Sequence, residues 1–205
     1  MKYLGSKKII TDRLELRRPT INEQKYLWTL LMNTKVNKYF LTVPKKYVEK
    51  LKDWNIQKNF YNDKVKNASS PNIFEWSIFL KNTDVCIGKI NCHNGNSKDD
   101  NIRDVSWIID PDYQHQGYAT EAAWGMLEFM FNECNINEIK TSAAIVNPAS
   151  WKLMEKLGFE RQEEKINNQY TYIDGLTECY LYYLNKDMYY KNKKNRKHIC
   201  LFCYF

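Results

Sequence analysis

The sequence lacks a long hydrophobic run. No stretch reaches the roughly 18 consecutive apolar residues that a membrane-spanning helix requires. Lys7, Lys8, Asp12 and Arg13 interrupt the place where the apolar core of a signal peptide would lie. We therefore expect an uncleaved cytoplasmic protein that does not bind a membrane. Its 205 residues, of which 43% are hydrophobic and 15% aromatic, favour one packed domain over two.

Metal ligands and catalytic histidines are also scarce. The chain has only three histidines. This number is too small for a His-rich metal site and disfavours a serine-protease-like triad. The six cysteines are scattered, which predicts free thiols rather than a disulfide framework. Only Cys200 and Cys203 have metal-like spacing, and His198 would bring their ligand set to three, without a visible fourth. We therefore predict no metal site.

The excess of positive charge is confined to one end of the chain. The net charge is +7, and residues 188–205 carry five of these charges and no acidic residue. A nucleic-acid-binding fold carries its basic residues on the folded surface, so we expect no nucleic-acid partner. We predict a domain over residues 9–187 and a solvated tail over residues 188–205, whose removal costs the domain little. The alternative is that the apolar end of the tail packs onto the body or onto a partner subunit.

Hydrophobic periodicity predicts strands and helices in a mixed order. Apolar residues alternate with polar ones in the predicted strands and recur at helical spacing in the predicted helices, the first of which begins with a capping box from Thr20 to Glu23. The order β-α-α-β-β-β-α-β-α-β-β indicates a single α/β domain without internal repeats. The predicted strands are 9–17, 73–80, 85–91, 102–110, 138–146, 170–173 and 176–184, and the later predicted helices are 45–61, 117–134 and 151–157.

The most informative motif lies where a strand is followed by a helix. The strand ending at Asp110 leads through a short loop into a helix whose first turn contains Gly117 and Ala119. The first N–H groups of a helix have no partner inside it, so they can bind a phosphate group, and small residues allow a diphosphate to approach closely. The loop lacks the Gly-Lys-Ser/Thr ending of a Walker loop and the glycine spacing of a dinucleotide fingerprint. We expect a different phosphate-bearing ligand.

These residues resemble a known family. Gln114, Gly117 and Ala119 match the pyrophosphate motif Gln/Arg-x-x-Gly-x-Gly/Ala of the GNAT superfamily of acyl-CoA-dependent N-acyltransferases. The strand before the motif, residues 147–150 at the start of the next helix and residues 155–159 at its end extend the resemblance. The segment from residue 11 to residue 17 looks like the opening of the RimJ/RimL-like branch of ribosomal-protein N-terminal acetyltransferases. The resemblance covers about residues 9–187.

The resemblance implies a fold and a cofactor site. The implied fold is α/β (α+β), a mixed and mostly antiparallel central sheet with flanking helices and a splayed parallel strand pair that admits the pantetheine arm of acetyl-CoA. Backbone amides around Ile108 to Asp110 would bond pantetheine and the thioester carbonyl, Asn147 would contact the arm, and the turn from Ser150 to Met154 would lie beside the sulfur. The cofactor-binding set is then Ile108, Ile109, Asp110, Gln114, His115, Gln116, Gly117, Tyr118, Ala119, Thr120, Asn147, Ser150 and Met154.

Acyl transfer to an amine also needs two proton movements. The amine, with a pKa of about 10, must lose a proton, and the departing thiolate must gain one. Met154 occupies the position where many family members have a proton-donating tyrosine. The RimJ/RimL-like branch commonly has a serine at the position of Ser150, so the resemblance implies Ser150 as the general acid, with helix N-capping as its alternative role. Glu75 is the predicted general base because it lies on the strand that faces the expected acceptor cleft. Its alternative role is that of a surface carboxylate.

The sequence therefore predicts an N-acetyltransferase that moves acetyl from acetyl-CoA to a primary amine by direct attack in a ternary complex. The acceptor is a small-molecule amine or a protein N-terminal amine, and the matched motifs contain no cysteine that would form an acyl-enzyme. The alternative is an acyl-CoA-binding regulatory or interaction module with little turnover, which Met154 keeps open. A homodimer is an expected assembly because dimers are common in similar families.

Overall fold

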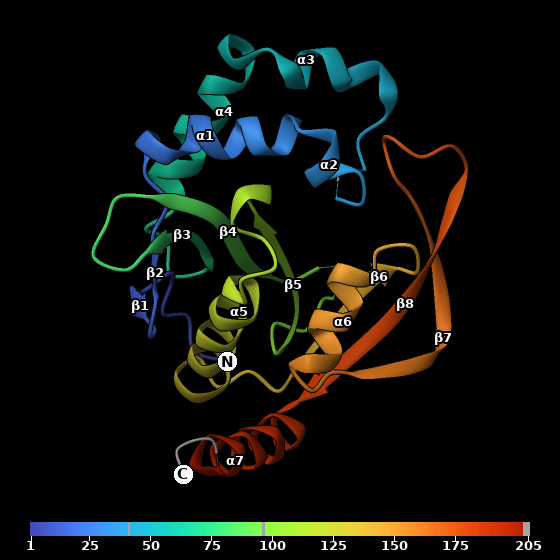
Figure 1. Ribbon diagram of the computed structural model, residues 1–205. Helices are drawn as coiled ribbons and strands as arrows, with labels where there is room; N and C mark the ends of the chain where they lie inside the picture. Colours follow the sequence, from blue (N-terminus) through green and yellow to red (C-terminus); the bar gives the residue numbers. More distant parts are fainter. Residues whose placement is uncertain (41, 96, 203–205) are drawn as a thin grey trace.

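The computed structural model contains one twisted sheet with helices on both faces (Figure 1). It describes residues 1–40, 42–95 and 97–202, with side chains described up to Lys194. The strand order within these residues is β1-β2-β3-β4-β5-β6-β8-β7, and all neighbours are antiparallel except the parallel pair β5 and β6. The mixed, mostly antiparallel sheet is thus confirmed. The strands are β1 Ile9–Ile10, β2 Leu14–Arg17, β3 Glu75–Leu80, β4 Cys86–His93, β5 Ile102–Ile109, β6 Glu138–Ala144, β7 Glu160–Gln169 and β8 Leu176–Asn185.

The helices divide between the two faces of the sheet. Helices α1 to α4 lie over one face, whereas α5 and α6 lie against the other (Figure 1). The helical elements are α1 Ile21–Met32, α2 Thr34–Asn37, η1 Lys45–Tyr47, α3 Val48–Lys52, α4 Trp54–Asn67, η2 Pro111–Tyr113, α5 Tyr118–Glu128, the π-helical turn η3 Phe129–Glu133, α6 Pro148–Lys156 and α7 Lys186–Phe202. No helix in the described part of the chain is long and apolar enough to cross a membrane.

The main hydrophobic core lies between the sheet and α5. Ala122, Ala123 and Met126 of α5 are buried in one cluster with inward-facing side chains of the strands, including Trp76 and Ile90. Two adjacent alanines allow the helix to lie close to the sheet, because they add little side-chain bulk between the backbones. This packing fixes the N-terminus of α5 relative to the end of β5.

The opposite face of β2, β3 and β4 is polar, and we call it the polar face. Its buried charged and polar members are Glu15, Glu75, Ser77 and Lys89, and Phe79 is a buried aromatic residue on the same face. Glu23 of α1 accepts a hydrogen bond from the Ser77 hydroxyl at 3.0 Å, which places α1 over this face. Because alternate residues of a strand point to opposite faces, the polar face and the apolar core come from the same strands.

Two predicted elements differ from the structure. The helix predicted over 45–61 is interrupted at Asp53, whose side chain caps α4 by accepting from the Asn55 N–H at 2.8 Å. The strand predicted over 170–173 is wrong: these residues connect β7 to β8, and β7 itself lies earlier. Most side chains of β7 are exposed because it is an edge strand, so it lacks the apolar alternation by which strands are recognised.

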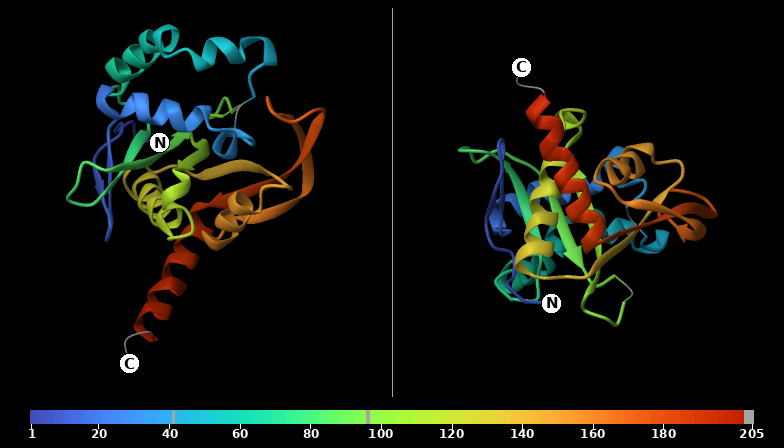
Figure 2. Two further views of the ribbon diagram at one scale, coloured as in Figure 1. Left: turned by 45° about the horizontal axis from the view of Figure 1, so that its top comes forward. Right: turned by 90° about the horizontal axis from the view of Figure 1, so that it is seen from below.

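The C-terminal segment forms a helix that begins on the body of the protein. Helix α7 spans the predicted boundary after Asp187 and then extends away from the body (Figure 2). Tyr189 is fully buried and stacks on Phe131, with ring centroids 4.8 Å apart. The expectation of a solvated tail from residue 188 onward is therefore wrong at its start, because an aromatic anchor holds the first turns of α7 against the core. The side chains of His198, Cys200 and Cys203 lie outside the described residues.

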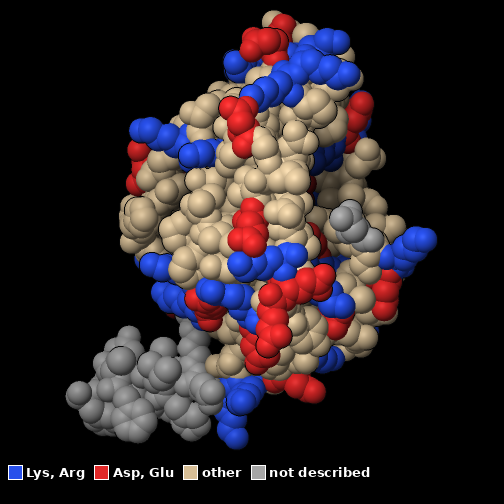
Figure 3. Space-filling model, turned by 90° about the vertical axis from the view of Figure 1, so that its right-hand side faces the viewer, with Lys and Arg blue, Asp and Glu red and all other residues tan. Residues whose placement is uncertain are grey.

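The surface and the described thiols agree with two further expectations. Basic and acidic side chains lie interspersed on the face drawn in Figure 3, as a nearly neutral body predicts. Four cysteines are described, and all four are free: Cys86, Cys92, Cys134 and Cys179. Among the described residues, no group of three or more His, Cys, Asp or Glu side chains could hold a metal ion.

Candidate active site

Two neighbouring strands separate at the centre of the sheet. The parallel strands β5 and β6 pair only at Ile102 with Glu138 and at Arg103 with Ile139. A last contact follows, in which the Thr141 hydroxyl donates to the Val105 carbonyl at 3.4 Å. Beyond this point β6 continues to pair with β8, whereas β5 follows β4. The predicted splayed pair is confirmed, and the backbone of the last part of β5 borders the gap.

The end of β5 turns one N–H group toward this gap. The Asp110 N–H is already used, because it donates to the Ile87 carbonyl of β4 at 2.9 Å. Successive residues of a strand point their N–H groups to alternate sides, so the Ile108 N–H also faces β4 and the Ile109 N–H faces the gap. The resemblance implies that the backbone amides from Ile108 to Asp110 bond the pantetheine arm and the thioester. Of these three amides only that of Ile109 is directed to the gap, because the N–H groups of Ile108 and Asp110 are directed to β4.

The loop that follows, residues 110–117, is exposed and shaped by backbone conformations that side chains rarely adopt. Gln114 fastens it to the strand by donating from its side-chain amide to the Ile109 carbonyl at 2.9 Å. His115 has φ 60° and an exposed ring, and Gly117 has φ 83° as the N-cap residue of α5. A Cβ atom at Gly117 would meet one neighbour, an Arg13 guanidinium nitrogen at 3.4 Å, so there is space over the loop.

Backbone donors are available at this helix N-terminus. The hydrogen bond from the Glu121 N–H to the Gly117 carbonyl at 3.1 Å is the first of α5. The N–H groups of Tyr118, Ala119 and Thr120 precede it and have no partner inside the helix. These donors and the positive end of the helix dipole favour an anionic group at this place.

Arg13, in the turn between β1 and β2, holds the loop and the helix together. Its Nε lies 2.7 Å from the Glu121 carboxylate, and its Nη1 donates to the Gln116 carbonyl at 3.1 Å. The guanidinium also lies over the Tyr118 ring, 4.5 Å from its centroid. Burial favours the neutral form of Glu121, but hydrogen bonds from Thr11 and Arg13 outweigh it and lower the pKa of this carboxyl. Sequence reasoning missed this clamp, although Arg13 lies in the N-terminal motif.

The family assignment follows from this arrangement together with a match over most of the chain. Residues 13–160 match the family described as acetyltransferase (GNAT) domain. The chain belongs to the GNAT acetyltransferase family. The uncharacterized N-acetyltransferase YnaD of Bacillus subtilis is 30% identical over 98 residues, which are 48% of this chain and 56% of that protein. The chain thus spans little more than half the length of this relative.

Solved GNAT structures share the fold. The ribosomal-protein-S5-alanine acetyltransferase of Vibrio fischeri is similar with a TM-score of 0.70 and 18% identity, covering 89% of this chain and 98% of that one. A spermidine N-acetyltransferase of Vibrio cholerae, in complex with CoA and spermine, has the same TM-score and identity and covers 86% and 98%. At this identity the likeness shows the fold alone. Because two differently named enzymes fit equally well, it does not single out the RimJ/RimL-like branch.

On the other side of the gap, this GNAT chain places three predicted residues on α6. Helix α6 begins at Pro148 with Asn147 as its N-cap residue, so Ser150 is the third helical residue and its alternative role as N-cap is wrong. The Ser150 side chain is half-buried and makes no hydrogen bond to any described residue. Met154 is 2% exposed and packs in the main core. It can therefore contribute an apolar wall but no proton.

Glu75 lies on the polar face, two strands away from β5. It is 8% exposed, so its alternative role as a surface carboxylate is wrong. Lys64 of α4 donates to it at 2.7 Å, and the Lys89 ammonium lies 4.0 Å away. Burial favours the neutral acid, but the positive charges of Lys89 and Lys64 outweigh it and lower the pKa of Glu75. Glu75 is thus ionised at neutral pH and held in an ion pair.

A further contact links α1 to the start of the loop after β5. The Tyr26 hydroxyl of α1 donates to the Asp110 carboxylate, whose other oxygen accepts from the Asp112 N–H at 3.0 Å. Burial and the bond to Asp110 raise the pKa of Tyr26, so it remains a neutral donor. The start of the loop is therefore held from the face opposite to α5. No sequence motif signalled this contact, because the two residues lie 84 positions apart.

Proposed function

We propose that this protein is an N-acetyltransferase that moves acetyl from acetyl-CoA to a primary amine by direct attack in a ternary complex. The observation that carries the proposal is the gap between β5 and β6, which opens beside an exposed loop and a helix N-terminus with free N–H donors. Membership of the GNAT family and a similar structure that holds CoA support the same ligand.

The residues present fit acetyl-CoA. The loop from Gln114 to Gly117 and the first turn of α5, Tyr118 to Thr120, would hold the diphosphate, because the loop has space above Gly117 and the turn supplies N–H donors. Asn147 and the Ile109 N–H border the gap on either side and would contact the pantetheine arm. When bound, acetyl-CoA supplies an acyl group that is activated as a thioester.

The chain's own groups would manage charge and protons. The Ile109 N–H would donate to the oxygen that becomes negative as the amine attacks, which is the principle of an oxyanion hole. Ser150 has a hydroxyl without a described partner and is the proposed donor to the departing thiolate. Glu75 is ionised and is the proposed base, although its ion pairs with two lysines make it a weak one.

A substitution at Gly117 tests the proposal. Gly117→Val places a β-branched side chain over the loop and should weaken acetyl-CoA binding, measured by calorimetry, at least about tenfold. Gly175→Val is the matched control, because Gly175 has a similar φ of 76° but nothing within 4 Å of its Cβ position and lies in the distant β7–β8 turn. Both variants carry similar backbone strain, so only a loss confined to Gly117→Val reports on the loop.

Turnover is measured as CoA release with acetyl-CoA and a panel of primary amines. Release that depends on an amine is the expected result. Equal acetyl-CoA affinity of the wild type and Gly117→Val, with native circular dichroism, would remove the loop assignment. Tight acetyl-CoA binding without release for any amine would identify the binding module instead.

A further inference from the structure

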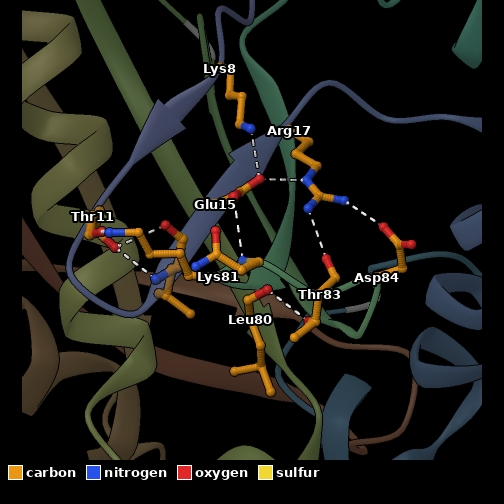
Figure 4. A network of polar contacts seen from close by, with 10 residues as sticks. Lys8, Thr11, Glu15, Arg17, Leu80, Lys81, Thr83 and Asp84 are labelled. Carbon is orange, nitrogen blue, oxygen red and sulfur yellow. Dashed lines mark hydrogen bonds and ion pairs between the residues drawn. The ribbon is translucent and has the colours of Figure 1, made fainter.

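The charged side chains of the polar face form two clusters, and the first is balanced. Glu15 accepts from Lys8 at 2.8 Å and from Arg17 at 2.9 Å, and Arg17 also donates to Asp84 at 3.0 Å (Figure 4). These bonds from Lys8 and Arg17 lower the pKa of Glu15 to about 2. Lys81, drawn in the same view, donates to the Thr11 backbone carbonyl at 3.0 Å instead. Two cations and two carboxylates therefore neutralise each other.

The second cluster has one cation too many. Lys64 and Lys89 share the single carboxylate of Glu75, at 2.7 Å and 4.0 Å. Lys89 is the more buried of the two lysines, with 8% of its surface exposed. Among the described residues, the Phe40 ring makes a further cation–π contact with Lys89, with its centroid 5.8 Å from the ammonium. An ammonium that is buried without its own counter-ion is unfavourable, so this site favours an added negative charge.

Two other carboxylates of this face, Glu23 and Asp104, do not act on Lys89. Glu23 of α1 is bonded to Ser77, the register partner of Lys89, and to the Thr20 N–H. Asp104 of β5 lies opposite His93 in the β4–β5 register, four residues beyond Lys89 and two residues beyond Asn91 along β4. Its carboxylate interacts with His93 and the Thr141 hydroxyl. Burial and the positive charge of Lys64 lower the Lys89 pKa to about 8, and the Glu75 carboxylate opposes this shift only in part. Lys89 is therefore mostly protonated at neutral pH and carries the excess charge.

Lys89 also lies next to the expected reaction centre. In the β4–β5 register it pairs with Ile108, the neighbour of the residue whose N–H faces the gap. Helices α5 and α6 occupy the other face of the sheet, so the diphosphate and the pantetheine arm would approach from there (Figure 1). An amine that attacks directly must then arrive from the polar face. The group that accompanies this amine would pass Lys89.

We propose that the acceptor is a primary amine that also carries a carboxylate, and that Lys89 binds this carboxylate. This inference rests on the proposed function. In the reaction the amine nitrogen forms a bond to the acetyl carbon, the carbon–sulfur bond breaks, the amine loses a proton and the thiolate gains one. The products are the N-acetyl compound and CoA, and the carboxylate is unchanged. A polyamine, by contrast, would bring more positive charge to a site that already has an excess.

The test compares acceptors that differ in one charge. Each of several amino acids is paired with its α-amide, and kcat/KM is measured by CoA release at saturating acetyl-CoA. The wild type should prefer the carboxylate by at least about tenfold, the scale of one charge-assisted hydrogen bond. Lys89→Met should reduce the preference to within about threefold, whereas Lys89→Arg should retain most of it. Lys66→Met is the matched control, because Lys66 is an exposed lysine of α4 paired with Asp63.

The preference is a ratio measured on one preparation, so partial unfolding of a variant does not change it. The amine basicity of the two acceptors differs equally for every variant and cancels when variants are compared. A wild type that prefers the amide or spermidine, or a Lys89→Met variant that keeps the full preference, would overturn the inference. If the wild type binds acetyl-CoA and turns over such amines, the proposed function still stands. Failure to bind acetyl-CoA would overturn both.

Discussion

The position of Tyr189 predicts that the C-terminal helix is part of the folded domain. Its ring is fully buried between the core and α7 and stacks on Phe131. Replacing a buried aromatic side chain by alanine typically costs about 3–5 kcal/mol, through lost burial and the cavity left behind. A domain of this kind is stable by about 5–15 kcal/mol, so Tyr189→Ala should remove a large part of the free energy of unfolding.

Two control variants separate the ring from its surroundings. The Tyr189 hydroxyl is buried and has no hydrogen-bond partner in the described part of the chain, so Tyr189→Phe removes no bond and should change stability by less than about 1 kcal/mol or increase it. Tyr190 is 43% exposed, and Tyr190→Ala should likewise cost about 1 kcal/mol or less. Truncation after Asp187 removes Tyr189 as well and should cost at least as much as Tyr189→Ala.

Urea unfolding followed by circular dichroism measures these differences. Truncation or Tyr189→Ala should lower the urea midpoint strongly, whereas Tyr189→Phe should change the midpoint little or raise it. A loss below about 1 kcal/mol for both Tyr189→Ala and the truncated chain would refute the reasoning and return residues 188–205 to a dispensable tail. Sedimentation of the truncated chain then shows whether α7 also affects oligomeric state.

Three further predictions concern the site. Arg13→Ala should weaken acetyl-CoA binding, measured by calorimetry, several-fold, because it releases the Gln116 carbonyl and leaves the Glu121 carboxylate unpaired beside the loop. Adding Glu121→Gln to Arg13→Ala should recover part of this loss. If the effects of the two substitutions on affinity simply add, Arg13 and Glu121 do not act together as a clamp. Ser150→Ala should lower kcat by roughly 100- to 10,000-fold with unchanged acetyl-CoA affinity, and a drop of threefold or less would exclude Ser150 as the acid. Burial and Lys64 lower the Lys89 pKa from 10.5 to about 8, so the unfolded chain binds more protons between these values and stability gains as pH rises through this window. Thermal unfolding from pH 7 to pH 10 should show this gain in the wild type relative to Lys89→Met, and parallel curves would contradict it.

The strand, loop and helix of the expected cofactor side could be predicted from the sequence because they are built from contiguous residues. Gln114, Gly117 and Ala119 fall within six positions, and the strand and helix that flank them have clear periodicity. The splayed pair was implied by the resemblance and is confirmed. Which N–H group faces the gap could not be predicted, because it depends on the register of β5 with β4. A shift of one residue would turn the N–H groups of Ile108 and Asp110 toward the gap in place of that of Ile109.

The acceptor side could not be predicted in the same way, because its residues come from distant parts of the chain. Lys64, Glu75 and Lys89 meet only after α4 packs over β3 and β4. In the sequence each of them is an ordinary charged residue. Only Glu75 was predicted as a site residue, because its strand faces the expected acceptor cleft. Alternation along β3 and β4 did indicate that one face of each strand is polar, but not that helices would cover it.

The burial of this polar face connects structure to specificity. Charged residues are seldom buried unless they are paired, and the Glu15 cluster follows this rule with equal numbers of cations and carboxylates. The Lys64–Glu75–Lys89 cluster departs from it by one positive charge, and Lys89 lies on β4, the strand that pairs with β5 beside the expected reaction centre. Stability alone would favour a neutral residue at position 89, because a buried excess ammonium destabilises the fold. The departure is therefore best explained by a ligand, and a carboxylate beside the acceptor amine would complete the cluster when it binds.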